Sequence, residues 1–556
     1  MTTAITIGMI IIYVAIMMGI GVYTARQTRS VSDFVLGSHS VGSWLTAFAY
    51  GTSYFSAVVF IGYAGQFGWT YGVSAAWVGV GNALLGSLLA WIVLGRRTRI
   101  MTQSLGAKTM PEYFEKRWNS KGLKIAAALI VFVFLIPYTA SVYNGLSRLF
   151  NMAFQIESEG AYKIIIIVMA LLTAIYVILG GYAATAINDF IQGIVMLIGI
   201  AAVVICAIQN QGGLTSALAA LGEIEVNGKT NTLNSVFGPD PLNLLGVVIL
   251  TSLGTWGLPQ MIHKFYAIKS ENDIKKGAVI STVFALIVAG GSYLLGGFDR
   301  LFCTLTEDGS GKTVISTLSN GKPDFDAMIP SLLHTALPDI LIGLVVVLVL
   351  SASMSTLSSL VLTSSSTLTI DLIKPNLKKC SDKKEMLIMR VLIAVFLVIS
   401  VLLAFNKNAS ISTLMSFMGC PCRCFSGAVH VWSVQQEDHQ AGSMDQLHSG
   451  NRSDTGAHVP VRLRLGSGTF QGCRKPAAES GFADQRRSHH HAALSDRGAG
   501  RQCPDKGQRS QARGTGLYLL CSSGKEGLIP QFSLSPNCNL FVMTKFLKNR
   551  QFSPMI

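Results

Sequence analysis

The chain has 556 residues, of which 50% are hydrophobic and only 13% are charged, and its mean hydropathy is +0.46. Soluble domains carry about 25% charged residues, so a chain of this size would expose too much apolar surface to water. The composition therefore excludes a soluble globular enzyme, a disordered chain and a small disulfide-stapled secreted protein, and it predicts an integral membrane protein.

Ten apolar stretches before residue 406 are each long enough, at about 20 residues, to cross a hydrocarbon core of about 30 Å. Lipid offers the backbone no hydrogen-bond partners, so we expect each stretch to be a helix. The first lacks a basic segment before it and is too long for a signal peptide, so we interpret it as a retained helix. The expected spans are 4–23, 42–66, 71–95, 125–150, 162–180, 183–209, 242–263, 277–298, 338–366 and 387–405.

Basic residues gather in alternate loops between these spans, and the intervening loops hold few. The positive-inside rule then places the basic loops in the cytoplasm and the N-terminus outside, in a multi-pass protein of the plasma or inner membrane. The basic set consists of Arg26 and Arg29, the segment 96–124, Lys264 with Lys269, Lys275 and Lys276, and the lysines of 374–384.

Small and hydroxyl residues interrupt the second expected span at residues 49–56 (AYGTSYFS). Burying a polar side chain at membrane depth costs about 2–7 kcal/mol unless the side chain has a hydrogen-bond partner. One interpretation is that the helix opens around Gly51 and frees carbonyls to bind a cation. The other is a small-residue face for helix packing.

A run of hydroxyl residues, 351–359 continuing to 363–367, lies in the ninth expected span. Some of these side chains can bond the carbonyl four residues earlier, which is harmless. The run is denser than helix packing requires, and hard cations bind neutral and anionic oxygens. We therefore favour an ion site over a packing face here.

Two further interruptions lie in the sixth and seventh spans. Asp189 is either an acidic residue near a helix N-terminus, where the helix dipole favours a negative charge, or part of a functional site. Residues 254–260 (GTWGLPQ) form either a proline kink or a break with polar groups for a ligand. Interrupted segments in corresponding positions of two halves are a pointer to a transporter site.

Four strings resemble the sodium/solute symporter family, which includes the sodium/proline and sodium/pantothenate carriers: residues 42–47, 180–193, 257–259 and 354–356. The resemblance covers residues 1 to about 419. It implies a LeuT-like fold of two inverted five-helix repeats preceded by one extra helix. It also implies a transporter rather than an enzyme, importing a small organic solute such as proline or pantothenate with sodium by alternating access.

By position in the family, a main sodium site would use the carbonyls of Thr52, Phe55 and Ala352 and the hydroxyls of Ser355 and Thr356. A second sodium, present in some members, would use Asp189, Ser358 and Ser359. The proline carriers have an aspartate where Tyr54 stands, which puts proline in doubt. The substrate-facing candidates are Ser53, Tyr54, Ser56, Thr255, Trp256 and Gln260.

From Cys420 the chain departs from the family and becomes hydrophilic, with 17 Lys and Arg against 9 Asp and Glu, a net charge of +8. Taken literally, its C-x-C-x-C string and residues 489–491 (HHH) are typical of a metal site. Reverse translation one nucleotide downstream instead permits a family-type loop from 435–442 and a membrane helix from 482–498. We therefore interpret 1–419 as a transmembrane core of about ten helices with the start of an eleventh, and 420–556 as a frameshifted, disordered tail.

Three alternatives remain. The chain could be a transporter-like membrane sensor, although it shows no kinase-like signature, or a frameshifted product without transport activity. It could also carry a real metal-binding tail. A frameshift would give the tail its charge by accident, so we expect a small solute and the lipid bilayer, and not nucleic acid, as partners.

Overall fold

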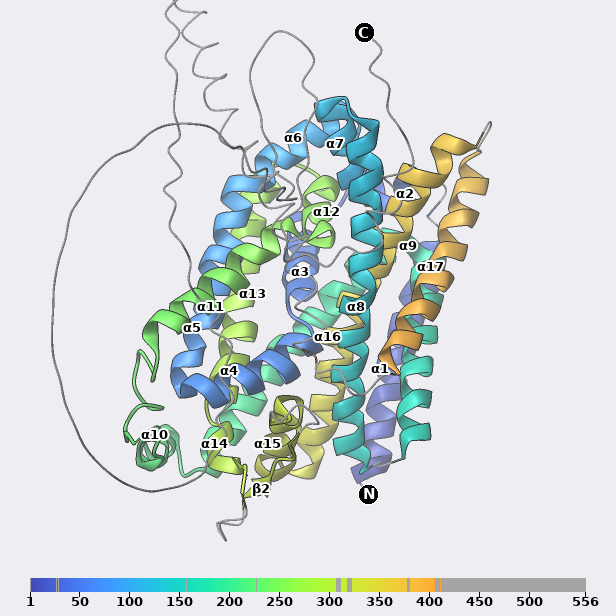
Figure 1. Ribbon diagram of the computed structural model, residues 1–556. Coiled ribbons are helices and arrows are strands. Elements are labelled where there is room, and N and C mark those ends of the chain that lie inside the picture. The colour runs from blue at the N-terminus through green and yellow to red at the C-terminus, as the bar shows by residue number, and fades with distance from the viewer. Residues whose placement is uncertain are drawn as a thin grey trace, which may run out of the picture. The chain divides into compact units, whose positions relative to one another are not determined.

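The described part of the chain is a bundle of helices in the computed structural model (Figure 1). Among the described residues, seven helices are long and apolar enough to cross a membrane, or eight if the bent pair Pro241–Gly257 and Pro259–Ala267 is one span. The expectation of a helical membrane protein is therefore confirmed. The structure describes residues 2–26, 28, 30–155, 158–226, 228–306, 312–317, 323–377, 381–405 and 411. The expectations for 420–556 fall outside these residues.

The first fifth of the chain is a series of short helical pieces after one long helix. Glycines and a break divide these pieces, and several of them are π-helical or 3-10. They are α1 (Thr2–Ala25), α2 (Val31–Leu36), η1 (Gly37–His39), α3 (Ser43–Tyr54), η2 (Val58–Tyr63), α4 (Ala64–Tyr71), η3 (Gly72–Ala75), α5 (Ala76–Gly81), η4 (Asn82–Leu88), η5 (Trp91–Gly95) and α6 (Arg96–Leu105).

Longer helices dominate the rest, with one small parallel strand pair, β1 (Cys303–Thr304) and β2 (Thr313–Val314). The helices are α7 (Met110–Trp118), α8 (Lys121–Phe154), α9 (Glu159–Asn210), α10 (Leu214–Glu223), α11 (Pro241–Gly254), η6 (Thr255–Gly257), α12 (Pro259–Ala267), α13 (Glu271–Gly296), α14 (Asp299–Phe302), η7 (Phe325–Ala327), α15 (Met328–Ala336), α16 (Asp339–Thr367), η8 (Leu368–Ile373), η9 (Lys374–Asn376) and α17 (Asp382–Ala404).

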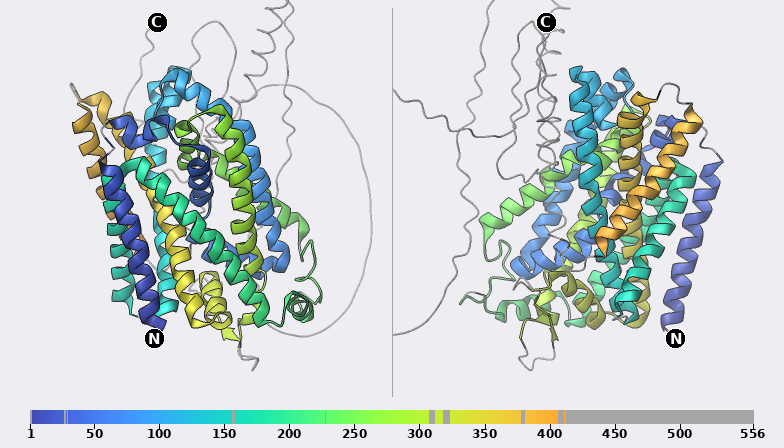
Figure 2. Two further views of the ribbon diagram at one scale, coloured as in Figure 1. Left: turned by 180° about the vertical axis from the view of Figure 1, so that it is seen from behind. Right: turned by 45° about the vertical axis from the view of Figure 1, so that its right-hand side comes forward.

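Helix α9 covers two of the expected spans, 162–180 and 183–209. Its 52 residues are more than twice what one crossing needs. At Gly181 the backbone leaves the helical region (φ 56°, ψ −144°), and the second half runs back diagonally across the bundle (Figure 2). By length and hydropathy α9 is a single candidate span, whereas the sequence predicts two spans in this segment. The number of ten membrane spans therefore stays a prediction.

Helix α16 is the centre of the bundle and packs against α1, α3, α8, α9 and α17. Of the candidate spans it is the most completely buried, with 78% of its apolar window covered. Elements α2, α6, α7 and α12 lie toward one end of the bundle, and the N-terminus, α10, α14 and α15 lie toward the other (Figure 1). The basic loops of the sequence accordingly share one end.

The break in the second expected span lies four residues beyond the glycine at which it was expected. Gly51 is inside α3, and its carbonyl accepts a hydrogen bond from the Phe55 N–H at 3.1 Å. A Cβ at Gly51 would meet the Phe284 ring at 2.4 Å, so this glycine allows a close helix approach. The helix ends at Tyr54, Phe55 is extended (φ −96°, ψ 119°), and helical structure resumes after Ser56.

Candidate functional site

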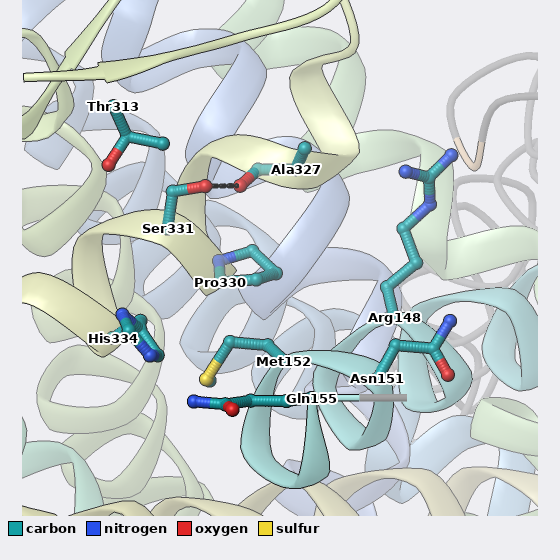
Figure 3. A pocket seen from close by; sticks show the side chains of 9 residues that line it. All are labelled: Arg148, Asn151, Met152, Gln155, Thr313, Ala327, Pro330, Ser331 and His334. Carbon is teal, nitrogen blue, oxygen red and sulfur yellow. Dashed lines mark hydrogen bonds between the residues drawn. The ribbon is translucent and has the colours of Figure 1, made fainter. Parts of the chain in front are cut away.

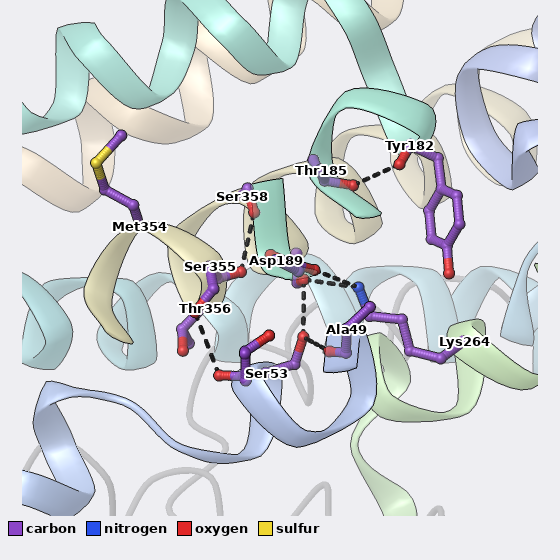
Figure 4. Close-up of polar contacts among 12 residues, drawn as sticks. Ala49, Ser53, Tyr182, Thr185, Asp189, Lys264, Met354, Ser355, Thr356 and Ser358 are labelled. Carbon is purple, nitrogen blue, oxygen red and sulfur yellow. Dashed lines mark hydrogen bonds and ion pairs between the residues drawn. The ribbon is translucent and has the colours of Figure 1, made fainter. Parts of the chain in front are cut away.

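The end of α3 meets the hydroxyl run of α16 in the middle of the bundle (Figure 4). The Ser355 hydroxyl lies 3.3 Å from the Thr52 carbonyl and 3.1 Å from the Ala352 carbonyl, and the Thr356 hydroxyl donates to the same Ala352 carbonyl at 3.0 Å. All four residues have no exposed surface. Four of the five expected ligands of the main sodium site therefore lie together.

The fifth expected ligand, Phe55, follows Thr52 at the break itself. Because Phe55 is extended, its carbonyl no longer points along the α3 axis as a helical carbonyl does. On the other side, the Tyr176 hydroxyl of α9 donates to the Met354 carbonyl at 2.8 Å and fixes α16 at this level. The cluster thus consists of neutral oxygens from two helices, with a third helix holding it in place.

A second cluster lies beside the first and contains opposite charges. The Lys264 ammonium of α12 is 3.4 Å from the Asp189 carboxylate of α9 and donates to the Ser359 hydroxyl of α16 at 3.0 Å. The Ser359 hydroxyl is also 3.0 Å from that of Ser53, which donates to the Ala49 carbonyl at 2.7 Å. This chain of contacts joins α3, α9, α12 and α16 in the bundle interior (Figure 4).

Lys264 is a functional candidate that sequence reasoning missed. It was expected in a basic cytoplasmic loop, but its side chain is only 2% exposed and lies inside the bundle. That expectation was wrong because α12 continues the broken seventh span inward instead of leaving it. A signal was available, since Lys264 interrupts a mostly apolar helix five residues after Pro259.

Of the expected ligands of the second sodium, Asp189 and Ser359 meet through the lysine. The Ser358 hydroxyl instead donates to the Ser355 carbonyl at 2.9 Å, on the side of the first cluster. Asp189 itself has no exposed surface. One of its oxygens, Oδ1, has no hydrogen-bond partner among the described residues.

The expected substrate residues at the end of α3 are buried, and two of them, Ser53 and Tyr54, contact other helices. Ser53 belongs to the charged cluster, and the Ser56 hydroxyl accepts a hydrogen bond from the Val58 N–H at 3.2 Å. The Tyr54 hydroxyl donates to the Thr251 carbonyl of α11 at 3.1 Å. Tyr54 therefore joins the α3 break to the helix that precedes the second break.

The expected substrate residues of the seventh span lie at and after its own break. The Thr255 hydroxyl donates to the Ser252 carbonyl at 2.8 Å, and the Trp256 indole donates to the Leu85 carbonyl at 3.0 Å. Gln260 is fully buried, and neither atom of its amide has a hydrogen-bond partner within the described part of the chain. Such a side chain is unusual, because buried polar atoms are nearly always paired.

A pocket of about 540 Å³ opens away from these clusters. The end of α8 forms one wall and α15 forms another (Figure 3). None of the expected substrate residues lines this pocket. Helix α15, which forms one of its walls, lies toward the same end of the bundle as the N-terminus (Figure 1). The lining residues of the pocket are Arg148, Asn151, Met152, Gln155, Thr313, Ala327, Pro330, Ser331 and His334.

Comparisons with known proteins bear on the family and on the fold. Residues 34–434 match the family model described as the sodium:solute symporter family. The sodium/proline symporters of Staphylococcus aureus strains JH9 and USA300 are each 31% identical over 417 residues, which covers 73% of this chain and 76% of the relative. The solved structure of a Na+-coupled sialic acid symporter, substrate-bound and outward-open, superposes with a TM-score of 0.61 at 17% identity. It covers 77% of this chain and 86% of that one, which shows a shared fold.

Proposed function

The chain belongs to the sodium:solute symporter family, and on that premise we propose that its core imports a small organic solute with sodium by alternating access. The observation that carries this proposal is the meeting of Thr52 and Ala352 carbonyls with the Ser355 and Thr356 hydroxyls. Hard cations take such neutral oxygens, and broken helices supply them at the membrane midplane. Sodium at this place would tie α3 to α16.

The residues beside the two breaks fit the binding of a solute. Tyr54 and Trp256 would supply apolar walls, and Gln260 would supply a buried amide whose nitrogen and oxygen have no partner among the described residues. An amino acid or another carboxylate with a polar group would satisfy that amide. Proline is the first solute to test, because the S. aureus relatives are sodium/proline symporters. The tyrosine at position 54, where proline carriers have an aspartate, makes pantothenate-like carboxylates the second.

Contacts at the basic end of the bundle fit a closed inner side. The Thr109 hydroxyl donates to the Asp371 carboxylate at 2.7 Å, and Lys124 pairs with Glu115 at 2.7 Å. These contacts join α7, α8 and η8, whereas α15, which lines the pocket near Arg148, lies toward the opposite end of the bundle (Figure 1). If the N-terminus lies outside, as the loop charges predict, the closed end faces the cytoplasm. Solute would then enter from the outside in this conformation.

We also propose that residues 420–556 are read in a shifted frame and that the parent protein continues with further membrane helices. The support is the sequence itself, in which one shift permits a loop from 435–442 and an apolar helix from 482–498. The five-plus-five repeat would then lack its last helix beyond the first turn in this chain. We expect the chain as it stands to bind sodium but to transport poorly.

Uptake into proteoliposomes tests the proposed function. We would compare the chain with a frame-restored version, using labelled proline, pantothenate and a sugar, with an inward sodium gradient or with choline in its place. We expect sodium-dependent uptake of one solute by the frame-restored protein and little uptake by the present chain. Sodium-independent uptake would contradict the proposed coupling, and equal uptake by both proteins would contradict the frameshift.

A further inference from the structure

The second sodium site that the family resemblance implies already contains a positive charge supplied by the protein. The Lys264 ammonium contacts both Asp189 and Ser359, two of the three residues that would hold this ion. Asp189 and Lys264 are almost completely buried, so water does not screen the pair. Resting on the proposed function, we infer that Lys264 acts as a tethered cation that excludes a second sodium, so that this chain binds one sodium.

Charge is the first reason. A sodium ion in contact with Asp189 and Ser359 would lie within a few ångströms of the ammonium, and like charges repel strongly in a buried, weakly screened place. Asp189 supplies one negative charge, which Lys264 already balances. The first cluster, in contrast, is built from neutral oxygens, namely the carbonyls of Thr52 and Ala352 and the hydroxyls of Ser355 and Thr356.

The oxygens are the second reason. Ser359 is already engaged by Lys264 and by Ser53, and Ser358 is turned toward the Ser355 carbonyl. Asp189 Oδ1 is the one ligand atom of the expected set that stays without a partner among the described residues. The ammonium of Lys264 thus contacts two of the oxygens, Asp189 Oδ2 and Ser359 Oγ, that a sodium ion would need here, since a hard cation takes several oxygen ligands.

The ammonium also holds helices together, as a bound ion at this place would. Lys264 belongs to α12, the half-helix after the break, and its contacts fasten that half-helix to α9 and α16. The ring of Tyr182 lies over the ammonium at 5.2 Å and closes its remaining side. The half-helix is therefore held in place by a cation that never leaves the protein.

Counting bound sodium tests this inference without any need for transport. The purified full chain in detergent would be titrated with ²²Na⁺ at equilibrium, together with Lys264→Gln and with Lys264→Gln/Asp189→Asn. We expect one sodium for the chain, two for Lys264→Gln, and one for the double variant, in which the freed carboxylate is gone. Lys269→Gln, which removes an exposed lysine five residues away, is the matched control and should leave one.

The outcomes are distinguishable. Two sodium ions on the unchanged chain, or one on a Lys264→Gln variant that keeps the first site, would overturn the inference and leave the proposed function intact. If Lys264→Gln does not fold, Asp189→Asn serves in its place: it should still bind one sodium, and loss of that ion would place sodium at Asp189 and overturn the inference. No sodium on any variant would contradict the proposed function itself.

Discussion

Two clusters beside α16 contain similar numbers of oxygens but differ in charge. The cluster around Ser355 is made of carbonyls and hydroxyls, whereas the cluster around Ser359 contains a carboxylate and an ammonium. A mobile cation gains most where no other cation is fixed nearby, so we propose that sodium binds at the first cluster and not at the second. The comparison teaches that the residues which could bind an ion do not by themselves define an ion site, because a neighbouring charge decides whether the ion enters.

The largest effect should come from removing the fixed cation. Lys264→Gln leaves the Asp189 carboxylate buried without its partner, which typically costs about 3–5 kcal/mol. We expect a large fall in the thermal midpoint of the detergent-solubilised chain in sodium-free buffer, partly reversed by sodium. Lys264→Gln/Asp189→Asn should recover much of the loss. If Lys264→Gln and the unchanged chain have the same thermal midpoint in sodium-free buffer, Lys264 and Asp189 do not form the stabilising pair that the structure shows.

The first cluster should respond to the loss of hydroxyls. Ser355→Ala with Thr356→Ala removes two proposed ligands, and even indirect changes at metal sites cost about 10–100-fold in affinity, so we expect sodium to bind at least ~100-fold more weakly. Sodium titration of the purified protein measures this. Thr363→Ala, two turns further along the same helix, is the matched control and should change the sodium affinity less than about twofold. If Thr363→Ala weakened sodium binding as much as Ser355→Ala with Thr356→Ala does, the result would contradict a sodium site at Ser355 and Thr356.

The break in α9 brings Asp189 into the bundle and can be tested at Gly181. The backbone there has φ 56° and ψ −144°, and a Cβ would meet the Phe34 carbonyl at 2.7 Å. Gly181→Ala should therefore destabilise the protein by about 1–3 kcal/mol, a cost typical of a side chain in that region. Thermal unfolding measures it, with Gly246→Ala as control, since nothing lies within 4 Å of a Cβ at that helical position. Equal stability of both variants would show that α9 does not need this break.

The smallest expected effect separates solute binding from sodium binding. Gln260→Ala removes the buried amide that lies without partners in the described structure. In the frame-restored protein we expect the KM for solute to rise roughly tenfold, because one hydrogen-bonded contact is worth about 1 kcal/mol or somewhat more. Sodium affinity should stay unchanged. A loss of sodium affinity with an unchanged KM would move Gln260 from the solute to the ion.

Sequence patterns predicted the helical membrane class and the two interrupted segments, because lipid and hydropathy restrict both. The meeting of Thr52 with Ser355, which are 303 positions apart, followed only from the family resemblance. The position of the α3 break did not follow, since Gly51 is needed for contact with Phe284 and the chain opens at Phe55 instead.

Lys264 could not be placed from loop charges. A lysine near the end of an expected span counts as cytoplasmic when the span is drawn straight, and only the bend of 54° between α11 with η6 and α12 brings it inside. Its partner Asp189 is 75 positions away in another helix. Local sequence carries no information on such a pairing, although a lone charge in an apolar helix is by default a candidate functional residue.

The most direct test of where the cation lies is a pair of experimental density maps of the protein, one recorded in sodium and one in choline. We predict a difference peak surrounded by the Thr52 and Ala352 carbonyls and the Ser355 and Thr356 hydroxyls, with Lys264 still on Asp189 in both maps. A peak at Asp189, with the lysine displaced, would contradict this account.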